Sequence, residues 1–95
     1  MAATLFVRHK VNDYDHWKRG YDAFTPVRNQ SSVTAASVHR DAHDPTVIIV
    51  THQFKDTGAM MKFANSDELK SAMANAGVIG IPEIWFGEDL EHTTY

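Results

Sequence analysis

The order of apolar and polar residues along positions 4–11 has the two-residue period of a β-strand. One face of this strand carries Leu5, Val7, His9 and Val11, and the other carries Phe6, Arg8 and Lys10. The more apolar face is the one expected to pack against helices. The alternation therefore predicts that His9 lies on the covered side of a sheet. It leaves open whether His9 borders a pocket there or fills the core.

The period changes to that of a helix in the next segment, which runs from about Asp13 to about Arg28. Its apolar stripe repeats at spacings of three and four and consists of Tyr14, Trp17, Tyr21 and Phe24. Asn12 or Asp13 is expected to cap this helix. Pro26 lacks a backbone N–H and crowds the preceding turn. The helix is therefore expected either to reach Arg28 or to stop at Phe24, followed by a loop over residues 25–32.

Two further strands are predicted over residues 33–40 and 46–54, joined by a turn-rich hairpin loop at residues 41–45. The second of these strands is the most apolar stretch of the chain, which is typical of a central strand covered on both faces. Since the helices of one chain cover one face, a second copy is the simplest cover for the other.

The rest of the chain is predicted to form helical pieces and a short last strand. The helical pieces begin near Ala59 and near Leu69, with Asn65 and Glu68 in a capping pattern between them. Gly77 is placed to end the second piece. Residues 78–82 are expected to form a loop, residues 83–86 a strand, and residues 87–95 a polar tail that contacts a dimer partner.

This order of elements is the βαββαβ plan of a ferredoxin-like α+β fold. We expect a single domain over residues 1–95, with an antiparallel sheet and helices on one face. The first and third strands are expected to lie side by side, and parallel, at the centre of the sheet. A two-fold homodimer that joins two open sheet faces would then form an α/β barrel.

Composition removes several classes of function. The chain has no cysteine, which excludes disulfides, thiolate metal sites and cysteine nucleophiles. Its formal net charge is −3 and it has no run of Lys or Arg, so no nucleic-acid partner is expected. No apolar run is long enough for a membrane span, and residues 1–4 do not begin a signal peptide. A cytoplasmic location without membrane partners is therefore expected.

Several stretches resemble a known group of proteins. They are residues 7–11, Asp13-Tyr14, Trp17-Lys18, residues 40–45, Phe63, residues 66–70, residues 76–78 and residues 82–84. Over nearly its whole length the chain resembles the dimeric α/β-barrel group of ferredoxin-like proteins, near the antibiotic biosynthesis monooxygenase family. It is most similar to bacterial members of about this length whose role is unassigned.

The resemblance implies a ligand site between the sheet and the helices or inside a dimer barrel. The group includes cofactor-independent quinone-forming monooxygenases, haem-degrading oxygenases, dehydratases and small-molecule-binding proteins. The Asn, Trp and His set of the haem-degrading branch is not assigned here, because Trp85 and the histidines lie in other sequence contexts, so that activity is not carried over to this chain.

Two of the six histidines are candidate catalytic residues. His9 and His52 each lie near the C-terminal end of a strand, and adjacent parallel strands would make the imidazoles neighbours. Such a pair can hydrogen-bond a ligand or move a proton near neutral pH. The alternative is that both are hydrogen-bonded structural residues. No metal-ligand spacing is present, so we expect neither a metal nor a tightly bound cofactor.

The candidate ligand-binding residues are Tyr14, Trp17, Tyr21, Arg40 and Trp85. Aromatic side chains with a polar atom can orient an aromatic ligand, although the same helical spacing is also typical of a core. Arg40 and Arg28 could bind an anion, or pair at the surface with Asp41 or Asp44.

Together these features predict a small cofactor-independent enzyme, monooxygenase-like or cyclase-like. Its substrate would be a hydrophobic, aromatic or polyketide-like small molecule. The alternative prediction is a homodimer without catalytic activity, which binds a small molecule or has a structural role.

Overall fold

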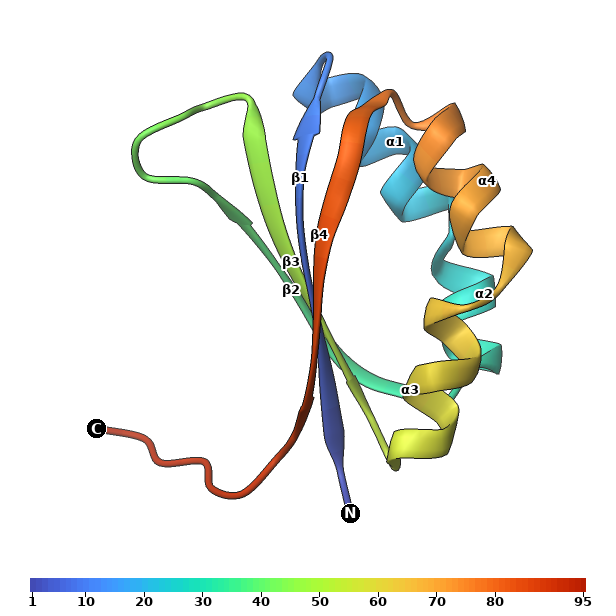
Figure 1. The fold of residues 1–95 in the computed structure, drawn as a ribbon, viewed down its shortest axis with the longest axis vertical. Coiled ribbons are helices and arrows are strands. Elements are labelled where there is room, and N and C mark those ends of the chain that lie inside the picture. The colour runs from blue at the N-terminus through green and yellow to red at the C-terminus, as the bar shows by residue number, and fades with distance from the viewer.

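The computed structural model describes residues 1–95 as a four-stranded sheet with helices on one face (Figure 1). In chain order the elements are β1 (Ala3–Val11), α1 (Tyr14–Ala23), α2 (Thr25–Gln30), β2 (Val33–Arg40), β3 (Val47–Phe54), α3 (Thr57–Ala64), α4 (Asp67–Asn75) and β4 (Val78–Glu88). The predicted ferredoxin-like α+β fold is confirmed. No helix combines the length and the apolar character that crossing a membrane requires.

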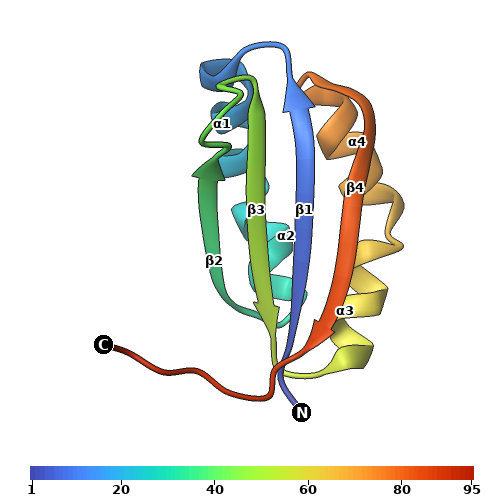
Figure 2. The same ribbon diagram turned by 60° about the vertical axis from the view of Figure 1, so that its left-hand side comes forward.

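The strand order is β2-β3-β1-β4, and every neighbouring pair is antiparallel (Figure 2). The central, adjacent position of β1 and β3 is confirmed, but the prediction that they run parallel is wrong. The crossover through α1 and α2 makes β2 parallel to β1, with one strand position left between them. The hairpin fills that position with β3, which must then run opposite to both neighbours.

The alternation along β1 sorts its side chains as predicted. Leu5, Val7 and Val11 are buried beneath the helices, together with His9. From β3 and the helices the core adds Ile48, Val50, Phe54, Trp17, Met60 and Phe63. Phe6 and Lys10 lie exposed on the opposite face, which none of the four helices covers (Figure 1).

Two short helices, α1 and α2, replace the single helix that one alternative predicted from about Asp13 to about Arg28. The Asp13 side chain accepts a hydrogen bond from the backbone N–H of His16 at 3.0 Å and so caps α1. The helix stops before Phe24, as one alternative predicted. The loop predicted at residues 25–32 is wrong, because Pro26 lies in the first turn of α2, where its missing N–H leaves no bond unmade.

The C-terminal half differs from the prediction at two points. Ser66, rather than Asn65, caps α4, since its hydroxyl accepts the N–H of Leu69 at 3.2 Å. β4 also begins at Val78, so the predicted loop over residues 78–82 is wrong. An edge strand tolerates Pro82, and a register shift opposite Arg8 and Lys10 accommodates the irregular backbone around Gly80. A contact between the tail and a dimer partner stays a prediction.

Helices α1 and α4 approach closely at Gly20, where an added Cβ would lie 2.9 Å from the Cβ of Ala76. We expect Gly20→Ala to lower the free energy of unfolding by about 1 kcal/mol, because overpacking outweighs the gain in helix propensity. Gly58→Ala is the matched control, since its Cβ would meet only Asp56 Oδ1 at 3.5 Å. Urea denaturation checks both variants. A Gly20→Ala protein at least as stable as Gly58→Ala would contradict the close approach.

Candidate functional site

A cavity of about 50 Å³ lies between the sheet and the helices. Its wall is formed by β1 and β3 below and by side chains of α1, α2, α3 and α4 above, and most of these side chains are apolar. Two imidazoles and one guanidinium reach it, from His9 on β1, His52 on β3 and Arg28 on α2, and Tyr21 of α1 adds a phenol. An apolar cavity with a few polar groups is the usual form of a small-molecule site.

His9 is 5% exposed, and neither of its ring nitrogens has a hydrogen-bond partner. Its imidazole lies 5.6 Å from the ring of Trp17, measured between centroids. Burial disfavours the charged imidazolium and lowers the pKa of His9 to about 4. His9 is therefore neutral at pH 7, with one donor and one acceptor nitrogen that no protein group binds.

His52 has a similar environment with one difference. It is 4% exposed, both ring nitrogens lack partners, and it packs 5.3 Å from the ring of Phe63. Burial lowers the pKa of His52 to about 4, and the positive charge of Arg28 acts in the same direction. A cation therefore lies close enough to His52 to oppose its protonation, and no such effect of a charged neighbour acts on the pKa of His9.

The two histidines share the cavity without being direct neighbours. In the antiparallel register His9 pairs with Ile48, while His52 pairs with Leu5. The two histidines are therefore offset by four residues along the strands. With a rise of about 3.3 Å per residue, the two Cα atoms are roughly 13 Å apart along the sheet. Both side chains point to the helix-covered face because four residues is an even offset. The predicted convergence on one point through parallel strands is therefore wrong, whereas both imidazoles do line one cavity.

The four ring nitrogens of this pair have an energetic consequence. A buried polar group without a partner costs about 1–3 kcal/mol, and the side-chain nitrogen and oxygen atoms in this position are all on His9 and His52. Groups that face a cavity can recover this cost by hydrogen bonding to a water or a ligand that enters it. The arrangement is therefore suited to holding a polar atom against an apolar surround.

The candidate ligand-binding residues divide into two groups. Trp17 and Tyr21 line the cavity, and their rings stack with centroids 5.0 Å apart. Tyr14 packs on Trp17 outside the cavity lining, and the Arg40 guanidinium carbon lies 5.2 Å from the Tyr14 ring centroid. Trp85 is 50% exposed and pairs with Phe6 on the uncovered face of the sheet, away from the cavity.

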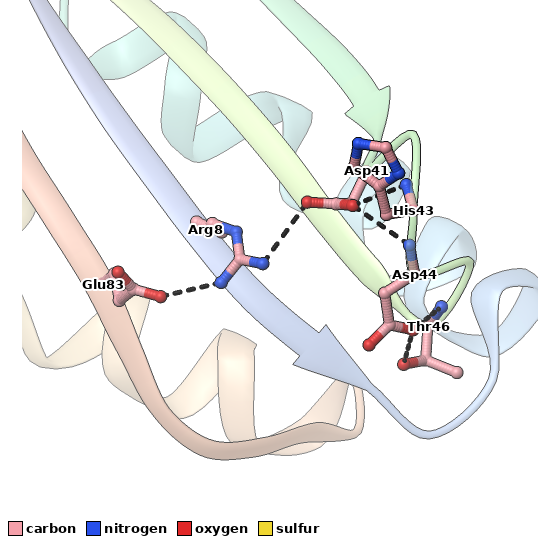
Figure 3. Close-up of polar contacts among 6 residues, drawn as sticks. All are labelled: Arg8, Asp41, His43, Asp44, Thr46 and Glu83. Carbon is pink, nitrogen blue, oxygen red and sulfur yellow. Dashed lines mark hydrogen bonds and ion pairs between the residues drawn. The ribbon is translucent and has the colours of Figure 1, made fainter.

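The expected ion pairs of Arg40 do not form, because Asp41 binds a different arginine. Arg8 bridges Glu83 at 2.8 Å and Asp41 at 3.3 Å across the open face of the sheet (Figure 3). Backbone N–H groups of the hairpin, helped by Arg8, lower the pKa of the Asp41 carboxyl below its usual value. Asp44 accepts from both the amide and the hydroxyl of Thr46 in the same turn. These bonds fix the hairpin and do not reach the cavity.

Part of the cavity wall was not proposed as a ligand site. Phe63, which touches His52, and Gly20, which lets α4 approach, carry no chemical group that would mark them in a sequence. The sequence predicts the α4 wall as an apolar helix stripe, in which Met73 could line a pocket or fill the core; its members are Leu69, Ala72, Met73 and Ala76. Nowhere do three or more His, Asp or Glu side chains come together as they would around a metal ion.

Comparison with known proteins identifies similar structures but no similar sequence. No protein-family model matches the chain, and no curated protein matches it. Its structure is similar to SnoaB, a cofactor-independent oxygenase from Streptomyces nogalater, with a TM-score of 0.77, 8% identity and 96% and 95% of the two chains covered. It is also similar to a protein from Caulobacter crescentus CB15 provisionally described as an antibiotic biosynthesis monooxygenase, with a TM-score of 0.75, 16% identity and 95% and 91% coverage.

A third similar structure is the NE2512 protein of unknown function from Nitrosomonas europaea, with a TM-score of 0.71, 22% identity and 99% and 94% coverage. These identities establish the fold alone. The chain has the ferredoxin-like fold of proteins like the antibiotic biosynthesis monooxygenases, as the sequence resemblance implied.

The buried histidines predict a pH dependence of stability. In the unfolded chain each has its ordinary pKa of 6.5, whereas in the folded protein each has a pKa of about 4. Between these values the unfolded state binds protons that the folded state does not. The free energy of unfolding should therefore fall as the pH is lowered, by up to about 1.4 kcal/mol per pH unit for each histidine.

Denaturation of the double variant His9→Leu/His52→Leu between pH 7.5 and 4 tests this expectation. Its stability should decline much less with falling pH than that of the unmodified protein. His92→Leu, in the exposed tail, is the control and should leave the decline unchanged. Equal declines in the double variant and the unmodified protein would show that His9 and His52 are not buried in their neutral form.

Proposed function

We propose that this protein is a small enzyme that works without a tightly bound cofactor and acts on a hydrophobic aromatic molecule in the cavity. The observation that carries the proposal is the set of four buried, unpartnered ring nitrogens on His9 and His52, two side chains that line an apolar cavity. Similarity in fold to SnoaB, described as a cofactor-independent oxygenase, supports the reaction class. Trp17 and Tyr21 are the proposed aromatic wall for the ligand.

The chemistry would be proton removal from the ligand, followed by oxygenation or rearrangement. For an aromatic ketone with an acidic methylene group, conversion of that CH₂ and O₂ to C=O and H₂O balances with dioxygen as the oxidant. His9 is the better proton acceptor of the pair because no cation lies against it. A proton on buried His9 becomes tolerable when the ligand, having lost that proton, carries a negative charge beside it.

His52 suits the complementary role. Beside Arg28 its imidazole stays neutral, so it can donate an N–H to an oxygen that gains negative charge during the reaction. The roles of His9 as base and His52 as hydrogen-bond donor are thus distinguished by the position of one arginine.

One observation favours the alternative, a homodimer that binds a ligand without converting it or has only a structural role. The cavity volume of about 50 Å³ is well below the volume of about 300 Å³ typical of the smallest ligand pockets. A ligand with three fused rings is larger than this volume, so the cavity would have to expand to admit it. A chain that never opens in this way would keep the histidines only as buried structural residues.

Oxygen consumption with anthrone as substrate tests the enzymatic proposal. We expect His9→Ala to lower turnover by about 100-fold or more, since a positioned proton acceptor contributes rate factors of that size. His43→Ala, in the exposed hairpin loop, is the control and should retain full turnover. Unchanged turnover in a folded His9→Ala protein would remove His9 from the mechanism.

We further propose that the protein is a homodimer that buries the open face of the sheet. Thr51, Phe6 and Trp85 are aligned across β3, β1 and β4 on that face, and no helix covers them (Figure 1). Phe6 and Trp85 are both exposed in the single chain. Exposed aromatic residues in register on a sheet favour contact with a second copy.

Light scattering at micromolar concentration should give twice the mass of one chain. Trp85→Glu should give a monomer, because it would place a charge in the buried centre of the contact. Met61→Glu is the matched control on the helical side, where Met61 is also partly exposed, and should remain dimeric. A stable monomer of the unmodified protein would refute the dimer.

A further inference from the structure

Arg28 is a buried cation in the wall of the same cavity. It is 7% exposed, and its guanidinium carbon lies 3.9 Å from the centroid of the Tyr21 ring. Its Nη2 donates to the backbone oxygen of Tyr21 at 2.7 Å and to Thr25 Oγ1 at 2.9 Å. These two bonds hold the guanidinium over the ring of Tyr21, in the lining of the cavity.

No carboxylate balances this charge. Arg28 takes part in none of the ion pairs of the structure, which involve Arg8 and Lys18. Asp22 is the acidic residue whose charge acts on Arg28, but its two oxygens bind Lys18 Nζ at 2.6 and 2.8 Å. Burial consequently lowers the pKa of Arg28, although an arginine remains charged at any physiological pH.

The bonding capacity of Arg28 is also incomplete. The hydrogen bonds that it makes all leave from Nη2, so Nη1 and Nε have no protein acceptor. Tyr21 places Arg28 near His52 on the cavity, since its ring centroid lies 3.9 Å from the Arg28 guanidinium carbon and 6.2 Å from the His52 ring centroid. One end of the cavity therefore offers a positive charge with free N–H groups next to an imidazole that can also donate.

We infer that the ligand of this cavity is an aromatic compound with an anionic oxygen, which binds Arg28 and His52 while its ring packs against Trp17 and Tyr21. This inference rests on the cavity being the ligand site of the proposed function. A largely buried charge without a carboxylate partner is unfavourable, and an anionic oxygen would compensate it more fully than water or a neutral ligand would. Trp17 and Tyr21 form a stacked pair beside Arg28, which matches a flat ligand.

Direct binding to the unmodified full chain tests this inference. Isothermal titration calorimetry at about pH 7.5 would compare 2-naphthoate with 2-naphthamide, which has a similar shape but no charge. We expect 2-naphthoate to bind at least 10-fold more tightly, as charge-assisted hydrogen bonds are stronger than neutral ones. Equal affinity, preference for the amide, or no binding of 2-naphthoate would each overturn the inference.

A third probe separates two sources of the negative charge. 1-Nitro-2-naphthol is ionised at this pH and presents a phenolate in place of a carboxylate. If it binds more tightly than 2-naphthoate, the natural ligand is a phenol or enol. If 2-naphthoate binds more tightly, the ligand is a carboxylic acid. Either order supports an anionic oxygen, provided that both probes bind more tightly than 2-naphthamide.

The variant Arg28→Met assigns the preference to a residue. It keeps an unbranched side chain against Tyr21, and it should reduce the 10-fold preference for 2-naphthoate to near parity while binding of 2-naphthamide persists. Arg8→Met, on the open face, should keep the full preference. An undiminished preference in folded Arg28→Met would place the anion elsewhere. The comparison on unmodified protein decides the inference even if Arg28→Met fails to fold.

These outcomes are distinct from those of the enzymatic proposal. Selective binding of 2-naphthoate without any oxygen consumption would support the anionic ligand and remove the enzyme. Turnover of anthrone without any preference between 2-naphthoate and 2-naphthamide would support the enzyme and overturn the anionic ligand.

Discussion

Alternation of side chains along a sheet covered on one face is the constraint on which the rest of the structure depends. Every second residue of β1 enters the layer beneath the helices, and an even offset brings residues of β3 into the same layer. His9 and His52 enter this layer because of their positions, alongside Leu5 and Val7. The same alternation sends Phe6 and Arg8 to the uncovered face. Core, cavity and open face thus follow from a single register.

The consequence for chemistry is an apolar layer that contains three polar groups with unused bonding capacity. The imidazoles remain neutral because water is excluded, and the guanidinium of Arg28 remains charged without a carboxylate. Such groups are destabilising unless something occupies the space between them. Helix α2, only six residues long, matters because it delivers Arg28 to this space. The polar groups that weaken the core are also the groups that a ligand would bind.

Much of the fold was predictable, since the periods of β1, α1 and β3 are strong and local. The predicted parallel pairing of β1 and β3 is wrong, because the crossover fixes the direction of β2 relative to β1 and leaves β3 antiparallel to both. β4 was predicted too short, because Gly80 and Pro82 normally end a strand and are tolerated only at an irregular edge. In the site, the two histidines were predicted from their chemistry, and the aromatic stripe that includes Trp17 was predicted from its helical spacing. The isolation of Arg28 was not predictable, since it depends on Asp22 being held by Lys18.

Titration of the histidine ring nitrogens by NMR tests most directly whether His9 and His52 are buried, neutral and unpartnered. The ¹⁵N chemical shifts of both rings should show neutral imidazole at pH 7.5 and through their ordinary pKa of 6.5, with protonation only as the pH approaches about 4. Rings of His9 and His52 that gain protons near their ordinary pKa of 6.5 would contradict the account, because they would be accessible to water and need no ligand.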